Sequence, residues 1–423
     1  MTSRCLTSLA LLALIVPRAA AEDTTFEAWS YTGTDIYPSA IIATATVDWH
    51  GATDDEAEAA EEEDAAAAEP AEAEEQEEAE PTPTFGDLNG WVGARLFDVA
   101  EGAKIRVEVS GEGWLKPSRT EVTVEEESDQ IIVMPKGIYD FAALGKIRQQ
   151  RPAVLTIKVS VNGKKLPDQT ENVILRSINE CPFLIKFEGD SEPDDLSWMF
   201  AAYVNENHPW IDRILKEALE AGLVDSFDGY QSGSPEKVAQ QVFAIWNIMQ
   251  RHGIRYSDIT ATPKSKFAYA QTVRFLDDSV KGSQANCVDG SVIFASILTK
   301  ISIKCGLVLV PGHCFVAFDL DPEGTLDPSG ETCIGLETTM LGADKLKPLS
   351  ALKDLPEAAK AEAMKTDTDA SGKTFLNAIA TAGEVLKKHA EEFLDDKVGL
   401  DYQIIAIDDA REYGIMPLAA PEK

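Results

Sequence analysis

The sequence has few basic residues, and this scarcity excludes several classes of function. Lysine and arginine number 38 against 72 aspartates and glutamates, which gives a net charge of −34 at pH 7. Nucleic-acid binding needs a basic surface, so we expect no nucleic-acid partner. Attraction to anionic membrane surfaces is disfavoured for the same reason.

Cysteine is also scarce, with six residues in 423. Five of them follow residue 21, and an odd number in an exported chain leaves at least one free thiol. No C-x-x-C pair of the kind that binds zinc is present. We therefore expect neither a disulfide scaffold nor a metal or other cofactor, and we favour buried thiols over disulfides for Cys181, Cys305, Cys314 and Cys333.

Long hydrophobic runs are missing except at the N-terminus. Residues 1–21 combine Arg4, a short apolar run ending at Pro17-Arg18, and the small residues 19–21. This is the pattern of a secretory signal peptide, and the run is too short for a membrane anchor of about 20 apolar residues. We expect an exported protein, periplasmic or extracellular, with no membrane insertion after signal cleavage.

The composition then divides the chain. Residues 22–52 form an N-terminal segment in which we expect a strand at Ile36–Trp49, because that stretch is rich in Ile, Thr and Val. Residues 53–84 contain 15 Asp and Glu with no Lys or Arg, and they have almost nothing to bury. Such a segment does not offset its ordering entropy, so we predict a disordered acidic linker.

Residues 85–190 read as an all-β, sandwich-like domain. Short runs alternate apolar and polar residues, as half-buried strands do, and Asn162-Gly163 is typical of a tight hairpin turn. The expected strands are 91–99, 104–109, 120–124, 130–133, 153–161 and 171–176. No catalytic constellation is present here, so we assign the domain a binding or spacing role with no named ligand.

Residues 191–423 change to helical periodicity and read as an α+β domain. The expected helices are 198–206, 210–221, 235–252, 287–300, 350–366 and 374–396. The expected strands are 307–310, 313–320, 332–337 and 402–407. The fold class is therefore α+β, with the all-β domain and the acidic linker preceding the second domain.

Cys287 and His313 are the candidate catalytic pair. Cys287 opens a predicted helix, where unpaired N–H groups and the positive end of the dipole favour a thiolate. His313 lies 26 residues later and is the one histidine of five that heads a strand. A thiol and an imidazole brought together are the nucleophile and base of acyl transfer. A structural Cys287 at an ordinary helix start remains the alternative.

A carboxylate is needed to orient the imidazole. Asp319 shares a strand face with His313, but six residues of strand span about 20 Å, which excludes contact. Antiparallel pairing of 313–320 with 332–338 places Glu337 almost opposite His313. We select Glu337 as the orienting residue, with Asp327 in the intervening loop as the second candidate. Cys314 lies on the opposite strand face and is expected in the core.

These segments resemble the transglutaminase-like cysteine superfamily. The resemblance rests on Ala285–Gly290 opening the helix, on Pro311–Val316 and on Leu336–Thr339. Upstream, Gln240–Trp246 and Gly253–Ser257 fit the helix and strand that precede the nucleophile. It covers residues 200–340, under half of the chain.

The resemblance implies a papain/transglutaminase-like catalytic domain with a Cys-His-Asp triad and no metal. Cys287 maps to the nucleophile and His313 to the base, while Asp327-Pro328-Ser329 matches the third motif and Glu337 matches it by strand position. Val288 stands where crosslinking members carry an aromatic residue. This favours peptide hydrolysis of a protein or peptide substrate through a Cys thioester. The alternative is a non-catalytic exported binding or scaffold protein that retains the fold.

Overall fold

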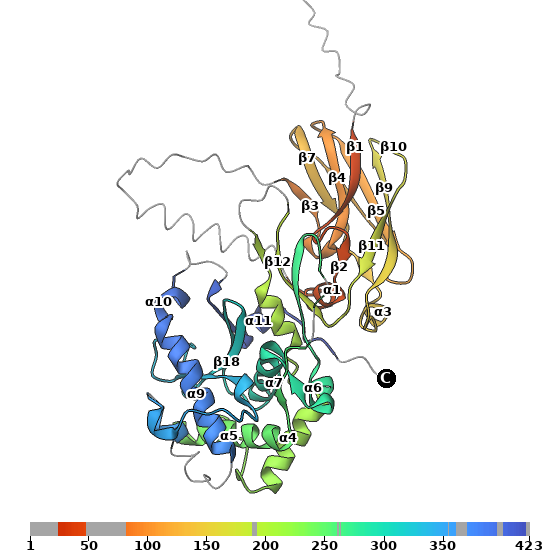
Figure 1. The fold of residues 1–423 in the computed structure, drawn as a ribbon. Helices are drawn as coiled ribbons and strands as arrows, with labels where there is room; N and C mark the ends of the chain where they lie inside the picture. Colours follow the sequence, from red (N-terminus) through yellow and green to blue (C-terminus); the bar gives the residue numbers. More distant parts are fainter. Residues whose placement is uncertain are drawn as a thin grey trace, which may run out of the picture.

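The computed structural model describes residues 24–47, 82–187, 193–259, 262, 264–353, 355–360, 370–395 and 401–419, and shows a mixed α+β fold with a β-rich N-terminal part (Figure 1). The predicted signal peptide lies outside the described residues. So does the predicted linker, except for 82–84 at its end, where Thr84 already begins a strand.

Two sheets form the N-terminal part. The first has the order β1-β4-β7-β3, and the second has the order β2-β11-β9-β5-β6-β8 with β10 paired to β9. The strands of the first sheet are β1 (Thr25–Ser30), β3 (Thr84–Gly86), β4 (Val92–Val99) and β7 (Ser128–Met134). Those of the second are β2 (Asp35–Ile36), β5 (Lys104–Gly111), β6 (Leu115–Thr123), β8 (Ile138–Tyr139), β9 (Arg151–Val161), β10 (Lys164–Lys165) and β11 (Gln169–Leu175). All six strands predicted between 85 and 190 are present, with ends shifted by a few residues.

Alternation explains how the two sheets pack. In β5 the side chains of Ile105, Val107 and Val109 are fully buried, while the residues between them are exposed or half-buried. The inward residues of both sheets, such as Leu96 of β4 and Ile157 of β9, belong to one hydrophobic core. Burial of each such side chain contributes about 1.5–3 kcal/mol to folding.

The predicted strand at Ile36–Trp49 is wrong. Of residues 36–47, the described part of that range, Ile36 alone lies in a strand, and Pro38–Ala43 forms the helix α1. Pro38 stands at the start of this helix, where proline has the right φ and needs no N–H partner. Ser39 then donates a hydrogen bond to the Glu180 carbonyl at 2.5 Å, and the helix is buried, so tertiary packing overrides the β-branched composition.

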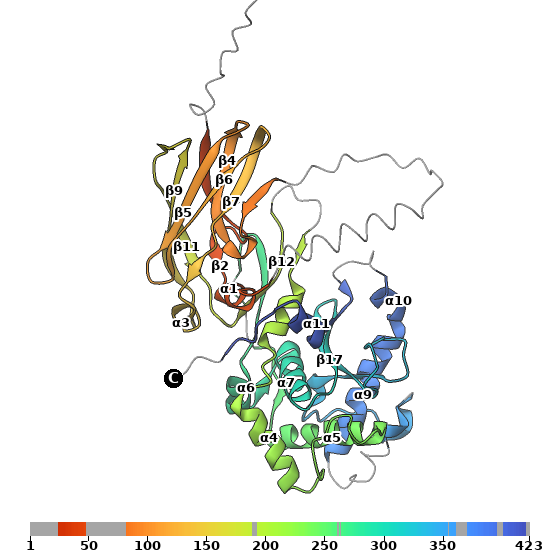
Figure 2. The same cartoon turned by 180° about the vertical axis from the view of Figure 1, so that it is seen from behind.

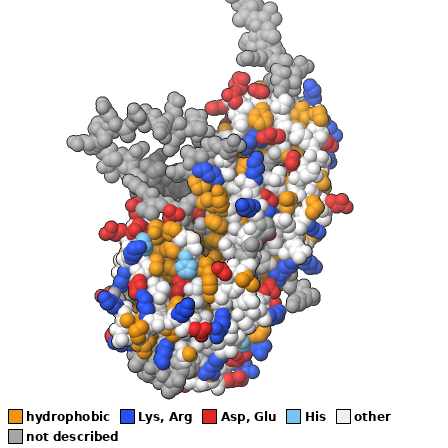
Figure 3. Space-filling model, viewed as in Figure 1, with side chains coloured by type: hydrophobic (Ala, Val, Ile, Leu, Met, Phe, Trp, Pro, Cys, Tyr) orange, Lys and Arg blue, Asp and Glu red, His pale blue; other side chains and the backbone are white. Residues whose placement is uncertain are grey.

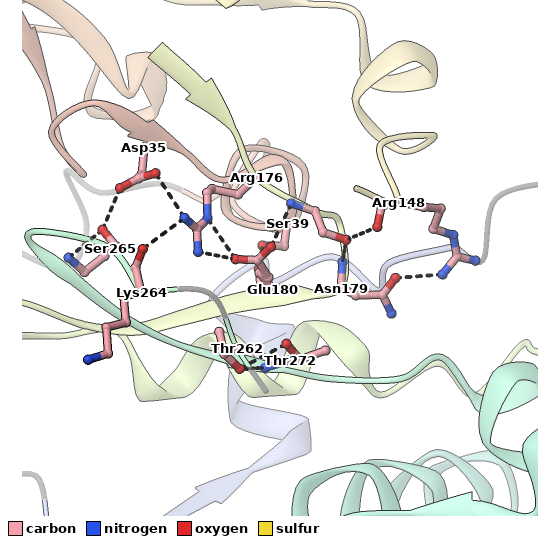
Figure 4. A network of polar contacts seen from close by, with 12 residues as sticks. Asp35, Ser39, Arg148, Arg176, Asn179, Glu180, Thr262, Lys264, Ser265 and Thr272 are labelled. Atoms are coloured by element: carbon pink, nitrogen blue, oxygen red, sulfur yellow. Dashed lines mark hydrogen bonds and ion pairs between the residues drawn. The ribbon is translucent and has the colours of Figure 1, made fainter. Parts of the chain in front are cut away.

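A central sheet joins the two parts of the molecule. It has the order β13-β12-β15, with β13 (Asp194–Asp195), β12 (Glu180–Ile185) and β15 (Ala268–Thr272). β12 comes from the end of the first predicted domain, yet it pairs with β15 from the second. The segment before β15 reaches the β-rich part, where the Ser265 hydroxyl donates to Asp35 at 2.7 Å (Figures 1 and 4).

The C-terminal part places a four-stranded sheet between helices (Figure 2). The sheet order is β19-β18-β17-β20, with β17 (Cys305–Val310), β18 (His313–Asp319), β19 (Cys333–Leu336) and β20 (Gln403–Ala406). The helices include α4 (Pro209–Glu220), α5 (Pro235–Arg251), α6 (Leu276–Gly282), α7 (Cys287–Lys300), α9 (Ala370–Lys388), α10 (Ala390–Phe393) and α11 (Ile407–Glu412). The predicted helix at 198–206 is the 3-10 helix η2 (Ser197–Tyr203). Of the predicted helix at 350–366, residues 350–351 lie in the 3-10 helix η4 (Leu349–Ala351) and residues 357–360 are helical, while 354 and 361–366 lie outside the described residues.

The two faces of this sheet pack on different helices. Cys314, Val316 and Phe318 join the large core that contains α7, whereas Phe315 and Ala317 pack with Ala382 and Leu386 of α9. The predicted strand phase of β18 is therefore correct, and Cys314 lies in the core. This arrangement fixes the start of α7 beside the start of β18.

Candidate active site

The start of α7 is fixed by a capping box. The Asn286 side chain accepts a hydrogen bond from the Asp289 N–H at 2.8 Å, and the Asp289 carboxylate accepts one from the Asn286 N–H at 2.9 Å. This reciprocal pair begins the helix at Cys287, which is half-buried. The predicted helix 287–300 has the bounds that the structure shows.

Asp289 also connects α7 to the segment that follows β15. Its side chain is fully buried, and it accepts hydrogen bonds from the Arg274 backbone N–H at 2.7 Å and guanidinium at 2.5 Å. Burial raises the pKa of Asp289, although the Asn286 and Arg274 hydrogen bonds act in the opposite direction. The sequence offered no signal for Arg274, because its contact depends on the fold of the segment between β15 and α7.

A tight turn places His313 at the head of β18. Val310 and His313 are paired in the hairpin of β17 and β18, so Pro311 and Gly312 alone make the turn. Gly312 has a φ of 71°, a conformation that favours glycine. The His313 side chain, 32% exposed, lies where the strand opens to solvent.

His313 joins Cys287 to Glu337. Its Nε2–H donates to Glu337 Oε2 at 2.6 Å, since a carboxylate only accepts, and the Cys287 side chain lies close enough to raise the pKa of the imidazole. All three residues selected from the sequence therefore meet at one place. The arrangement is that of a nucleophile, a base and a group that orients the base.

Glu337 is held rigidly where β19 ends. Its side chain is 6% exposed, and Oε1 accepts hydrogen bonds from the Thr339 N–H at 3.0 Å and hydroxyl at 2.6 Å. The strand register pairs Val316 with Leu336, so Glu337 lies diagonal to His313 instead of nearly opposite. The side chain, and not the backbone register, completes the contact.

The pKa shifts of the pair have complementary causes. Hydrogen bonds with Cys287 and Glu337 raise the pKa of His313 to about 10, against the effect of burial. Burial would raise the pKa of Glu337, but His313 and Thr339 outweigh it and lower that pKa. Both shifts favour an imidazolium beside a carboxylate.

The second candidate, Asp327, is hydrogen-bonded within its own loop and not to His313. It accepts hydrogen bonds from the Ser329 N–H at 2.8 Å and hydroxyl at 2.7 Å, which close its own loop. Asp319 behaves similarly and accepts from the N–H groups of Asp321 and Leu326. Neither carboxylate orients His313 in this structure.

The remaining cysteines and histidines of the described chain do not repeat the arrangement. Cys181, Cys305, Cys314 and Cys333 are free and buried, in agreement with the expectation of buried thiols, and burial raises the pKa of each. His252 and His389 each contact a glutamate, at 2.7 and 3.0 Å, and His208 accepts from the Trp210 N–H. His50 lies outside the described residues.

A cleft of about 240 Å³ opens beside Cys287 and His313. It lies between β12, η2 and β15 on one side and the β17–β18 turn on the other. Its walls include Phe183, Phe200, Gln271, Val288, Leu309 and Val310. Sequence reasoning missed Phe183, Phe200 and Gln271, because their place depends on the pairing of β12 with β15, two strands more than 80 residues apart.

No group of three or more His, Cys, Asp or Glu residues in the described ranges is arranged to hold a metal ion. Within the same ranges, no helix is long and apolar enough to cross a membrane. No model of a known protein family, no curated protein and no solved structure matches the chain.

Proposed function

We propose that the protein is an exported, thiol-dependent acyl-transfer enzyme with a papain/transglutaminase-like catalytic domain, and that it hydrolyses peptide bonds. The observation that carries this proposal is the position of His313, which is hydrogen-bonded to Glu337 at 2.6 Å and lies beside Cys287 at the same cleft. Export rests on the signal-peptide pattern of residues 1–21.

Each residue has a defined role in the proposed reaction. His313 holds the thiol proton as an imidazolium, and the Cys287 thiolate attacks the carbonyl carbon of the amide. Glu337 holds the imidazole in the orientation that faces the sulfur and stabilises its positive charge. When the tetrahedral intermediate collapses, His313 protonates the leaving amine and a thioester remains on Cys287.

Water then completes the cycle. His313 removes a proton from a water molecule, which attacks the thioester and releases the acid and the free thiol. Backbone N–H groups in the first turn of α7 lack intrahelical partners and point toward the nucleophile end, where they would stabilise the oxyanion. Crosslinking transglutaminases carry an aromatic residue next to the nucleophile, and Val288 takes that position here. This difference favours water over an amine as the acceptor.

The test measures products of both possible reactions. The protein and its Cys287→Ser variant are incubated with an unfolded protein and a fluorescent primary amine, and new N-termini and amine incorporation are quantified. We expect new N-termini with the wild-type protein alone. New N-termini from both proteins, or from neither, would contradict the proposal, and the latter would favour the non-catalytic binding protein.

A further inference from the structure

The cleft beside Cys287 is walled by hydrophobic side chains from four separate elements. Phe183 of β12 stacks on Phe200 of η2 with ring centroids 5.7 Å apart. Val288 follows the nucleophile on α7, and Leu309 and Val310 end β17. Figure 3 shows hydrophobic side chains gathered around histidine side chains on the face of the C-terminal part that is turned to the viewer.

The charges around the cleft restrict what it accepts. Apart from His313, its only ionisable lining residues within the described chain are Asp401, Cys287 and the buried Cys314, and no lysine or arginine of the described residues lines it. A carboxylate bound here would lose water and would lie near the carboxylate of Asp401, while the one cationic group of the lining, the His313 imidazolium, is already paired with Glu337. Its transfer into the cleft is therefore costly. An apolar side chain would gain from the same transfer.

The size and place of the cleft identify the bound group. A volume of about 240 Å³ is below the roughly 300–1,000 Å³ of pockets that hold whole drug-sized ligands, so it suits one side chain. The cleft touches Cys287 itself, so this side chain must stand close to the carbonyl that is attacked. A glutamine side-chain amide has only a methylene stem next to its carbonyl and would leave the cleft unfilled. A backbone peptide bond carries a full side chain at that distance.

We infer that this cleft is the specificity site for the acyl donor, and that the substrates are peptides with a bulky apolar residue next to the cleaved bond. The inference rests on the proposed function, since it names the substrate class of the same site. It predicts that acidic residues at this position are rejected and that glutamine side chains are poor donors.

The test uses peptidyl acyloxymethyl ketones that differ in one residue, with Leu, Asp or Gln next to the reactive group. The Cys287 thiolate displaces the carboxylate leaving group to form a thioether, and the thiol proton stays on His313. Labelling rates at Cys287 are measured by mass spectrometry. We expect the Leu probe to react at least about 10-fold faster than the Asp and Gln probes, because side-chain fit in an apolar pocket is worth roughly 10–200-fold.

A variant that adds a positive charge to the cleft tests the same inference. Val310→Arg adds a cation to the half-buried edge of the cleft and should reverse the preference between the Asp and Leu probes. Val154→Arg is the matched control, because Val154 is 48% exposed on β9 of the N-terminal part and should leave the preference unchanged. If Val310→Arg does not fold, the labelling rates of the three probes on the wild-type protein still test the specificity site.

Alkylation with iodoacetamide distinguishes a failure of the specificity site from a failure of the proposed function. Selective alkylation of Cys287 with equal rates for all three peptidyl probes would overturn the specificity site and leave the proposed function standing. Alkylation of wild-type protein that shows no selectivity for Cys287 would overturn the proposed function and the specificity site together.

Discussion

Two carboxylate–cation clusters of this molecule differ in exposure and in chemistry. At the junction of the two parts, Arg176 lies between Asp35 and Glu180 at 3.3 and 2.6 Å, and the three side chains are 2–8% exposed (Figure 4). In the candidate active site, His313 contacts Glu337 at 2.6 Å, but the imidazole is 32% exposed and has a thiol as its second partner.

The difference separates a structural cluster from a reactive one. Arg176 also donates to the Lys264 carbonyl at 3.4 Å, and Asp35 accepts from Ser265, so the junction ties together segments far apart in the sequence (Figure 4). A guanidinium stays protonated at any ordinary pH and cannot transfer a proton. An imidazole exchanges its proton, and the open side of His313 gives a substrate access to it.

Substitution of Cys287 should separate activity from stability most clearly. Cys287→Ser should lower the rate of acyl transfer by a factor on the order of 10⁴ or more, since the attacking atom is replaced. The free energy of unfolding should change by less than about 0.5 kcal/mol, because the thiol is half-buried. Peptide hydrolysis and urea unfolding measure the two effects.

Cys333→Ser is the matched control for that change. Cys333 is a buried free thiol, so the variant should lose stability and keep its activity. Equal losses of activity in the two serine variants would contradict the assignment of Cys287 as nucleophile.

At the junction we expect the reverse behaviour. Arg176→Ala leaves Asp35 and Glu180 buried without their cation and should lower the free energy of unfolding by about 3–5 kcal/mol. The rate of Cys287 alkylation should stay within about 2-fold of wild type under conditions where the variant is folded. A slower alkylation rate without loss of stability would show that the junction is part of the reactive site.

Glu337→Gln should lower the reaction rate strongly and the stability of the fold less. The amide cannot stabilise an imidazolium, so we expect kcat/KM to fall by about 10²-fold and the pKa of His313 to drop. The pH–rate profile then loses activity at a lower pH on its alkaline side. Glu337→Asp, which keeps the charge, should recover part of the loss, and a profile unchanged in both variants would exclude Glu337 as the orienting residue.

The ion pair also predicts how stability depends on pH. The folded pKa of His313, about 10, lies above its ordinary value of 6.5, so its contribution to stability is complete below about 6.5 and is lost as pH rises through 10. The pKa of Glu337 is lowered, so its contribution is present above its ordinary value of 4.5 and is lost as pH falls. The stability difference between wild type and His313→Ala should therefore shrink from pH 6.5 to pH 10. A constant difference across this range would contradict the pairing.

The smallest effect should come from Asp327. Asp327→Asn removes a carboxylate that bonds only within its loop, and we expect kcat/KM within about 2-fold of wild type. A loss as large as that of Glu337→Gln would transfer the orienting role to Asp327.

Local patterns in the sequence predicted much of this structure. Helical periodicity predicted the helix at 287–300, and strand alternation separated His313 from Cys314. Antiparallel pairing placed Glu337 on the strand next to His313, although the register puts it diagonal and its side chain completes the contact. These features depend on neighbours in the chain or on one antiparallel hairpin.

What the sequence did not predict depends on contacts between distant segments. The α1 helix is stabilised by its burial against β12, and the cleft arises where β12 meets β15. The Arg274–Asp289 pair likewise needs the path of the chain from β15 to α7. No local propensity encodes such contacts.

Site-resolved alkylation tests the central claim, that Cys287 and His313 act as one reactive pair. Wild-type protein and His313→Ala are treated with iodoacetamide at pH 6, and each cysteine is quantified by mass spectrometry. We predict fast alkylation of Cys287 in the wild-type protein, little reaction at Cys181, Cys305, Cys314 and Cys333, and a large loss of Cys287 labelling in His313→Ala. Equal labelling of Cys287 in the two proteins, or none in the wild-type protein, would contradict the account.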